Sequence, residues 1–448
     1  MKGRLWMSFL LLFFPFLLFA QEPIGLEEAI ELALKRSPSL RAQRQAIQEA
    51  EYQRKAALAR FFPKVDTTYT YIRLDEAPKA VIPPLTGKTI PGGELVVTDY
   101  FSRKAGTRDN YSLEVTVTQP LYTGGALRNG YLLAKLGVDK ARLEYETARL
   151  DLILKVKEAY YGVLVAKKMV EVAQKALDAL REHHRIAQAF FEQGMIPKND
   201  LLQVEVELAQ REKDLISAQK GLEVAKAYFN TLLRNPLEQG VVLKERLVKV
   251  PFEGSLQGCI HLALEKRPEV KLARLAVEAA RREAKVALSG LLPQISLVFN
   301  YERQGDDPSV SGSPYNPDED SWNVMAVAQW RIWDFGETYF GYKGKEARVL
   351  KAEHTLREIL DNIRLEVKEA YLALWEAEKA IEVSEKVLEQ AEENFRANEE
   401  RYRVQVATSS DVLDALAMLT RARANYWTSL ADHNIALARL KRAMGVER

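Results

Sequence analysis

The chain carries one sequence unit twice, and such a duplication restricts the possible fold more than any single motif does. The pentapeptide at 30–34 recurs at 260–264 with one substitution, an offset of 230 residues. The pentapeptide at 156–160 recurs unchanged at 367–371, an offset of only 211 residues. Because the offset falls by 19 residues between these points, the first copy must hold a longer loop, which we place at about 75–110 where Pro and Gly are frequent.

Each copy is predicted to contain the same elements in the same order. A short helix and a second helix of about 20 residues come first, followed by two strands, a very long helix, a tight turn and a long return helix. The chain therefore divides into a leader, a first repeat, a linker and a second repeat, at 1–20, 21–234, 235–255 and 256–448. The strands are expected at about 64–73, 111–121, 293–303 and 321–333, and the long helical hairpins at about 125–234 and 336–444.

The leader has the composition of a secretion signal. Lys2 and Arg4 give a positive start, Leu10–Phe19 is an unbroken apolar run, and the small residue Ala20 follows. We expect a cleaved signal peptide ending at Ala20, because a membrane anchor would need about 20 apolar residues. No cysteine lies near this point, so we expect no lipid anchor. No later segment has the composition of a membrane-spanning helix, so any insertion into a membrane would use strands.

The predicted strands alternate between apolar and polar residues, which places one face in an apolar phase and the other in a polar one. In the first strand Val65, Tyr69 and Tyr71 alternate with Asp66 and Thr68. This pattern fits either a soluble sheet packed on a core or a barrel with lipid outside and water inside. Aromatic residues near the strand ends favour the barrel, since membrane barrels carry such girdles. They are Tyr71, Tyr111, Tyr122, Tyr301, Trp322, Trp330 and Trp333.

The number of strands has a consequence for assembly. Four strands per chain are too few to close a barrel of useful bore, and an open sheet edge cannot face lipid. If the strands span a membrane, several chains must therefore share one barrel, and three chains would give twelve strands. The predicted fold class is mainly α-helical with a membrane β-barrel shared by three duplicated chains.

The long helices carry a coiled-coil seam, in which apolar positions alternate in steps of four and three, a period of about 3.5 residues. In the first copy these positions are Leu152, Val156, Ala159, Val163, Ala166, Val170, Ala173, Leu177 and Leu180, and in the second Ile363, Val367, Ala370, Leu374, Ala377, Ile381, Ser384, Leu388 and Ala391. Further apolar residues such as Leu164 and Ala380 lie off the seam, so each helix can meet two neighbours. This favours a hollow tube of helices, although the helices alone also fit a solid antiparallel coiled coil used as a spacer.

The duplicated order of helix, strand pair and long hairpin resembles the TolC family of outer-membrane channels over essentially the whole mature chain. The most specific match is the second hairpin turn at 401–415, where TSSDVLDA at 408–415 is similar to the Thr-x-x-Asp-Val-Leu-Asp-Ala start of the family's return helix. A weaker version of this turn lies at 191–202. The resemblance implies a homotrimer with a twelve-stranded barrel in the outer-membrane lipid and a helical tube that crosses the periplasm and narrows at the hairpin tips.

The resemblance also implies an aperture at the second hairpin tip. Asp411 and Asp414 match two acidic residues, one helical turn apart, that line the closed aperture in the family. Three-fold symmetry would arrange them as two rings of carboxylates, which attract cations and hinder anions. Crowding in such rings should raise some of the carboxyl pKa values. The alternative is ordinary helix N-terminal chemistry, in which Asp satisfies free backbone amides, and Asp411 can serve both purposes.

Other tip residues acquire roles in the same way. Asp200 and Tyr402 match residues that help to hold the helices shut in the family. Gln405 replaces the usual turn glycine, and Ala407 replaces an arginine partner found in some members, so we expect different contacts to hold the closed state. The adaptor-docking positions implied by the resemblance are Gly194, Met195, Gln405 and Val406.

Composition and motifs argue against other common functions. The formal net charge is only +2, which offers no basic surface for nucleic acid. The sequence has no phosphate-binding glycine loop and no nucleophile beside a base, and the adjacent pair His183–His184 points in two directions on a helix. The single Cys259 excludes an internal disulfide and a multi-cysteine metal site. We therefore predict no enzymatic activity, no catalytic residue, no cofactor and no bound metal.

The favoured functional hypothesis is a passive exit duct of a tripartite efflux pump or a type I secretion system. It would conduct substrate from a proton-driven or ATP-driven inner-membrane pump, through a periplasmic adaptor protein, to the exterior, with gating at the hairpin tips. The alternative is a non-conducting periplasmic or surface structural protein built on a coiled coil. The substrate stays open among drugs, metal ions and secreted polypeptides.

Overall fold

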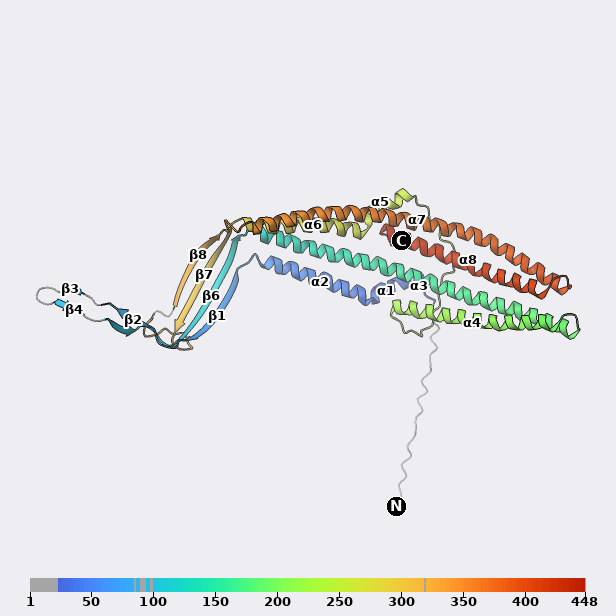
Figure 1. The fold of residues 1–448 in the computed structure, drawn as a ribbon, viewed down its shortest axis with the longest axis horizontal. Helices are drawn as coiled ribbons and strands as arrows, with labels where there is room; N and C mark the ends of the chain where they lie inside the picture. The colour runs from blue at the N-terminus through green and yellow to red at the C-terminus, as the bar shows by residue number, and fades with distance from the viewer. Residues whose placement is uncertain (1–22, 84–85, 89–93, 97–99, 318–319, 448) are drawn as a thin grey trace, which may run out of the picture. The chain divides into compact units, whose positions relative to one another are not determined.

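The computed structural model describes residues 23–83, 86–88, 94–96, 100–317 and 320–447, so the expected signal peptide at 1–20 lies outside the described residues. The described chain is mainly helical with a small number of strands (Figure 1). It divides into two compact units. Unit 1 comprises Met1–Ala42, Tyr145–Pro268 and Leu360–Arg448, and unit 2 comprises Gln43–Glu144 and Glu269–Ile359. Each unit takes segments from both sequence repeats, so the compact units cut across the duplication.

The elements of the two repeats begin at the two offsets seen in the sequence. An offset of 230 residues relates the first three elements of the two repeats. It pairs α1 (Leu26–Arg36) with α5 (Leu256–Lys266), α2 (Pro38–Ala59) with α6 (Pro268–Leu288), and β1 (Lys64–Arg73) with β7 (Gln294–Gly305). An offset of 211 residues relates the last three elements. It pairs β6 (Asp109–Tyr122) with β8 (Asp320–Gln329), α3 (Ala126–Glu192) with α7 (Glu337–Arg403), and α4 (Lys198–Leu233) with α8 (Ser409–Met444). Both long helices have 67 residues and both return helices have 36. The two hairpins are therefore equal in length.

Proline separates the first two helices of each repeat. Ser37 and Arg267 have extended backbone, as a residue before proline prefers, and each ends the preceding helix. Pro38 and Pro268 then occupy the first position of the next helix, where a missing N–H leaves no hydrogen bond unmade. The sequence thus sets these two corners locally.

Unit 2 contains an antiparallel sheet of four strands in the order β1-β6-β7-β8 (Figure 1). Aromatic residues face each other across neighbouring strands, with Tyr71 opposite Tyr111 and Tyr301 opposite Trp322. The first two rings stack with centroids 4.7 Å apart, a contact that helps to fix the strand register. Within the described chain, β1 and β8 each pair on one side only, so the sheet has two open edges.

Two expectations for unit 2 were wrong. The fourth strand was expected to reach 333, but β8 ends at Gln329 because its partner β7 begins at Gln294, directly after Pro293, which has no N–H to donate to a ladder. Trp330 and Trp333 consequently lie beyond the strand, and both are exposed.

The stretch at 75–110, expected as a loop, contains further short strands. β2 (Lys79–Ile82) pairs with β5 (Phe101–Lys104), and β3 (Thr86–Lys88) pairs with β4 (Glu94–Val96). These strands have three or four residues each. Runs this short are too brief for alternation to separate them from loop, which is why the periodicity did not reveal them.

Unit 1 is built on the helical hairpins, and the predicted coiled-coil seam is its buried face. Every seam position in unit 1 is buried or half-buried, including Val156, Leu180 and Val367. The main core joins α1, α3, α4, α7, α8 and the linker around Tyr160 and Phe229, whose ring centroids lie 5.9 Å apart. Fully burying one such large apolar side chain contributes about 1.5–3 kcal/mol, so this core fixes the hairpins at one level of the unit.

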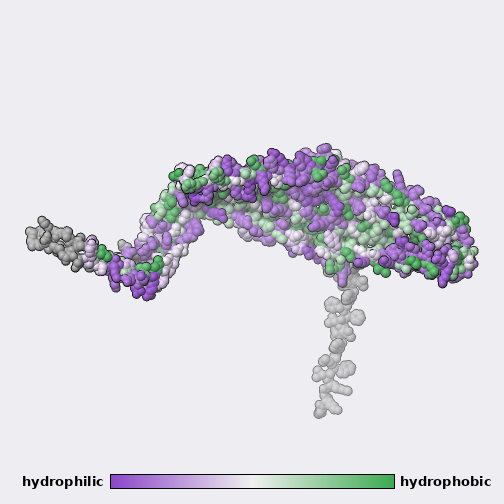
Figure 2. Space-filling model, in the orientation of Figure 1, coloured by the Kyte–Doolittle hydropathy of each residue, from purple (hydrophilic) through white to green (hydrophobic). Residues whose placement is uncertain are grey.

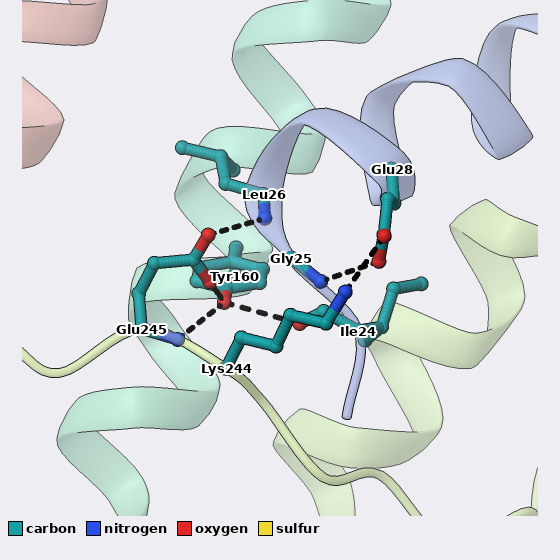
Figure 3. A network of polar contacts seen from close by, with 7 residues as sticks. All are labelled: Ile24, Gly25, Leu26, Glu28, Tyr160, Lys244 and Glu245. Atoms are coloured by element: carbon teal, nitrogen blue, oxygen red, sulfur yellow. Dashed lines mark hydrogen bonds and ion pairs between the residues drawn. The ribbon is translucent and has the colours of Figure 1, made fainter. Parts of the chain in front are cut away.

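The linker between the repeats is anchored to the N-terminal segment through Tyr160 (Figure 3). The Tyr160 hydroxyl lies between the carboxylate of Glu245 and the carbonyl of Ile24, and it donates a hydrogen bond in this network. The same carboxylate accepts a hydrogen bond of 3.0 Å from the backbone N–H of Leu26, the first residue of α1. Lys244 binds Glu28 at 2.7 Å. A residue of the linker therefore caps the first helix of the chain.

Surface polarity varies over short distances along the helices of unit 1. The face drawn in Figure 2 shows hydrophilic and hydrophobic residues interspersed along these helices, without one long apolar band. In the part of the chain that the structure describes, no helix combines the length and the apolar character that a membrane crossing needs.

Candidate functional site

The turns of the two hairpins have the same backbone geometry, at one end of unit 1 (Figure 1). In the first turn, the N–H groups of Gly194 and Met195 donate to the carbonyls of Phe191 and Phe190, at 2.9 and 2.8 Å. In the second turn, Gln405 and Val406 donate to Tyr402 and Arg401 at the same distances. This pattern of nested bonds, closed by a left-handed residue, is the Schellman ending of a helix. The backbone of one tip thus repeats that of the other.

The left-handed residue differs between the tips. Gly194 has a φ of +71° and Gln405 a φ of +61°. Gly adopts this conformation at no steric cost, whereas a residue with a Cβ is destabilised there by roughly 1–2 kcal/mol. The absence of glycine at 405 therefore leaves the turn geometry intact and adds local backbone strain.

The start of the return helix differs in the opposite sense. Pro197 precedes α4 and has no side-chain cap, whereas Thr408 precedes α8 and forms a complete capping box with Asp411. The Asp411 carboxylate accepts bonds from the backbone N–H and hydroxyl of Thr408 at 2.8 and 2.7 Å, and the hydroxyl accepts one from the Asp411 N–H at 3.2 Å. The hydrogen bonds from Thr408 lower the pKa of Asp411. Asp411 therefore serves the start of the helix.

Asp414 lies one helical turn beyond Asp411 on α8, and both side chains are exposed. Among the described residues no hydrogen bond or ion pair involves the Asp414 carboxylate, in contrast to that of Asp411. The buried neighbours Val412 and Ala415 point into the hairpin instead. The two carboxylates assigned to an aperture thus share an exposed face of α8, and one of them has no local structural task.

The structure brings the two assigned gate residues together. Tyr402, at the end of α7, is only 3% exposed, and its ring lies 5.6 Å from that of Phe190 on α3. Burial raises the pKa of Tyr402, the nearby charge of Asp200 raises it further, and the Ser409 hydroxyl partly offsets this rise. Within the described chain the Tyr402 hydroxyl has no hydrogen bond of acceptable geometry. Tyr402 therefore joins the first hairpin to the second mainly through its ring.

Beside Tyr402 lies His183, which the sequence reasoning considered only as a metal ligand. His183 is 4% exposed, and its ring lies 4.7 Å from the Tyr402 ring. Its Nε2 is 2.9 Å from the Ser409 hydroxyl, a hydrogen bond that connects α3 with the start of α8. Burial, with a smaller effect from His184, lowers the pKa of His183 to about 4. The available signal was its spacing, three residues after the buried Leu180 and four before the buried Ala187, which places it on the buried face.

The extreme ends of both tips expose apolar side chains. Met195 is 52% exposed in the first turn, and Val404 and Val406 are 69% and 64% exposed in the second. Both turns therefore present apolar residues and backbone groups outward, as a docking surface would. Among the described residues, no three His, Cys, Asp or Glu side chains are grouped as metal ligands would be.

Comparison with known proteins gives a family match over both repeats. The model of the family described as outer membrane efflux protein matches residues 29–233 and 259–446. These ranges contain the four strands of the main sheet and the eight α-helices of the described chain. Only the first residues of α1 and α5 lie outside them.

Among curated proteins, the chain is similar to the alkaline protease secretion protein AprF of Pseudomonas aeruginosa. The two are 28% identical over 367 residues, which is 79% of this chain and 72% of AprF. It is also 25% identical over 207 residues to the outer membrane efflux protein BepC of Brucella suis, or 45% of this chain and 40% of BepC. The pyoverdine export outer membrane protein OpmQ of Pseudomonas putida is 22% identical over 44% of this chain and 42% of its own length.

Solved structures share the fold at low sequence identity. The outer-membrane channel OprN superposes with a TM-score of 0.77 and 18% identity, over 94% of this chain and 89% of OprN. CusC superposes with a TM-score of 0.77 and 17% identity over 96% of both chains. CmeC, an outer membrane channel of Campylobacter jejuni, gives a TM-score of 0.74 and 18% identity, over 94% of this chain and 85% of CmeC.

Proposed function

Because the chain belongs to the outer membrane efflux protein family, whose TolC-like members form exit channels in the outer membrane, we propose that three copies assemble into one passive duct. Four strands from each chain close a twelve-stranded barrel in the outer-membrane lipid, and the helical hairpins form a periplasmic tube. The signal peptide is cleaved after Ala20. The duct supplies no energy and performs no catalysis.

The open sheet edges carry this proposal. Within the described chain, β1 and β8 each have one neighbouring strand, so a row of backbone groups on each lacks a strand partner. Both strands also expose apolar side chains, including Val65, Tyr69, Trp322 and Val324. An open edge is not tolerated in lipid, so pairing of β8 in one copy with β1 in the next is the arrangement that satisfies these groups.

An exposed apolar stripe on α7 supports the tube. It consists of Leu365, Leu372, Trp375, Val383 and Val387, and it lies away from the buried seam of the same helix. A helix with a buried seam and a second apolar stripe can pack on two sides, as a closed ring of helices requires. A solid antiparallel pair would leave this stripe in water.

The duct works with two partners in this proposal. A periplasmic adaptor protein docks at the tips, on the apolar and backbone groups of Gly194, Met195, Gln405 and Val406. An inner-membrane pump, driven by protons or by ATP, delivers the substrate. Among the relatives named above, the alignment that spans most of both chains is with a secretion protein, which favours a polypeptide as cargo over a small molecule. Co-purification of the pump with the duct would identify its class.

Gating takes place at the hairpin tips. Asp414 and Asp411 of three copies form two rings of carboxylates that favour cations, while Tyr402 and Asp200 hold the hairpins together. The exposed and unpaired state of the Asp414 side chain supports its place in the ring. The Asp411 carboxylate divides its role between the ring and the capping box.

The test is conduction by the purified protein in planar lipid bilayers. We expect a heat-modifiable trimer in the outer-membrane fraction, single-channel conductance, and block by hexaamminecobalt(III) added on the tip side. The Asp414→Asn variant keeps the size of the side chain and removes its charge, so block should weaken about tenfold, with a further loss in the Asp411→Asn/Asp414→Asn pair. Asp361→Asn, on an exposed position of α7, is a control that should leave block unchanged. A soluble monomer without conductance would instead support the non-conducting structural protein.

A further inference from the structure

A buried polar contact joins the two hairpin tips of one chain. The hydrogen bond between His183 Nε2 and the Ser409 hydroxyl, at 2.9 Å, crosses from the long helix of the first hairpin to the return helix of the second. Its surroundings are apolar: a small cluster of Leu180, Ala187, Leu201, Val204 and Leu416 packs beside it. Because this cluster also draws on both hairpins, apolar packing and the His183–Ser409 hydrogen bond act together at the tips.

The hydrogen bonds of this site favour a neutral imidazole over a protonated one. Among the described residues, Nδ1 of His183 and the hydroxyl of Tyr402 are both buried without a hydrogen-bond partner. A neutral imidazole has one donor and one acceptor and can satisfy Ser409 with either. A protonated imidazole has two donors, and here the second would be buried with no acceptor, at the full cost of its desolvation. A proton therefore disfavours the closed contact.

The charged groups around His183 have other partners or lie at the rim. On α3, His184 is 3.8 Å from Glu205 of α4, and Glu182 binds Arg185, with Arg403 of α7 nearby. Asp200 of α4 faces Tyr402. On α8, the Asp411 carboxylate is bound by Thr408.

We propose that His183 and Ser409 form a latch that holds the two hairpin tips together, and that protonation of His183 releases it. The latch rests on the proposed gating at the tips. It supplies a contact for the closed state, in which Gln405 and Ala407 replace the glycine and arginine of the family. Tyr402 completes the latch by covering the imidazole with its ring.

The latch occurs once in each chain because the duplication does not repeat it. At the offset of 211 residues, His183 corresponds to Asn394, which is exposed, and Ser409 corresponds to Lys198, which is also exposed. Tyr402 corresponds to Phe191, which has no hydroxyl. The contact is therefore a feature of the junction between the hairpins and not of each hairpin.

The sign of the pH effect follows from linkage. In the latched state the pKa of His183 is about 4, against an ordinary value of 6.5 when the side chain is exposed. Between these values the released state binds a proton and the latched state does not, so release becomes about tenfold more favourable for each unit by which pH falls. Over the whole range from pH 6.5 to about 4, the equilibrium constant for release of the latch rises about 300-fold per chain.

The first measurement is the open probability of the full-length trimer in planar bilayers between pH 7.5 and 4.5. The wild type should open increasingly below pH 6.5. His183→Gln keeps an amide that can bind Ser409 and cannot take up a proton, so its profile should be flat. Ser409→Ala should open about tenfold more often at pH 7.5. His261→Gln, at an exposed position of α5 away from the tips, is the control and should follow the wild type.

The second measurement does not depend on conduction. Spin labels on Gln188→Cys and Ser410→Cys, both exposed positions on the two joined helices, report the separation of the tips. The distance should widen on acidification in the wild type and not in His183→Gln. If the distance changes without conductance, the duct proposal fails and the latch stands. If the His183→Gln variant keeps the wild-type pH profile and distance change, the latch is wrong; if that variant does not assemble, unchanged opening in Ser409→Ala overturns the latch.

Discussion

The two hairpin tips have the same backbone conformation, but different side chains stabilise it. The first tip has glycine at its left-handed position and no side-chain cap on the return helix. The second has Gln405 at the left-handed position and a capping box between Thr408 and Asp411. One tip therefore avoids strain and does without a cap, whereas the other carries strain and offsets it with three hydrogen bonds.

This difference shows what the duplication preserves. The helix ends, the nested turn bonds and the helix lengths repeat, because they follow from the register of two long packed helices. The residues that stabilise the turn are free to vary as long as their summed effect is similar. The second tip has used this freedom to place a carboxylate, Asp411, at the helix start, and the first has placed Asp200 at the same position of α4 without a capping partner at Pro197.

The largest expected effect comes from giving the first tip the residue of the second. Gly194→Gln should destabilise the first turn by roughly 1–2 kcal/mol, because a Cβ at a φ of +71° is strained although no atom lies within 4 Å of it. Hydrogen exchange of the Met195 amide should accelerate about tenfold. Gly162→Ala, in the interior of α3 with equally open space, is the control and should not accelerate exchange. Unchanged exchange in Gly194→Gln would remove strain from the comparison.

A smaller effect is expected from removing the cap of the second tip. Thr408→Ala should cost about 1 kcal/mol and should accelerate exchange at the Asp411 amide several-fold. The Thr408 bonds lower the pKa of Asp411 below 3.8, so their contribution is present above that pH and is lost as pH falls through the lowered pKa. Carboxyl titration by NMR should show this pKa returning toward 3.8 in the variant. Thr408→Ser, which keeps the capping hydroxyl, is the control and should leave the pKa of Asp411 lowered.

The smallest effect is a gain from relieving the strained position. Gln405→Gly should stabilise the second turn by about 0.5–1 kcal/mol. Glycine has no Cβ and so no steric strain at this φ, but it loses more conformational entropy on folding, which offsets part of the gain. Exchange of the Val406 amide should slow two- to fivefold. Combined with Thr408→Ala, the two changes should nearly cancel at the tip. Faster exchange in Gln405→Gly would mean that the glutamine side chain makes a stabilising contact of its own.

Long-range periodicity made most of the fold predictable. The seam through Val156 and Leu180 repeats over many turns, so each position supports the others, and the four sheet strands alternate over about ten residues each. The resemblance to the TolC family, which rested on the duplication and on 401–415, is confirmed by the family match. The membrane barrel and the trimer stay predictions.

Single contacts between distant segments were not predictable. His183 and Ser409 are 226 residues apart, and only the packing of one hairpin on the other brings them together. The positive φ of Gln405 depends on the helices at both sides of the turn. The residue type alone predicted a negative φ, because residues other than glycine rarely adopt positive values. The short strands at 79–82 and 101–104 stabilise each other as a pair, which neither segment reveals separately.

The cap of α1 by Glu245 sets an order on the biogenesis of the chain (Figure 3). The carboxylate that satisfies the Leu26 N–H is 219 residues further along, beyond the whole first hairpin. The Leu26 N–H can therefore bind this carboxylate only once the chain extends through the linker. A chain that ended at 234 would keep both helices of the first hairpin and would lack this cap.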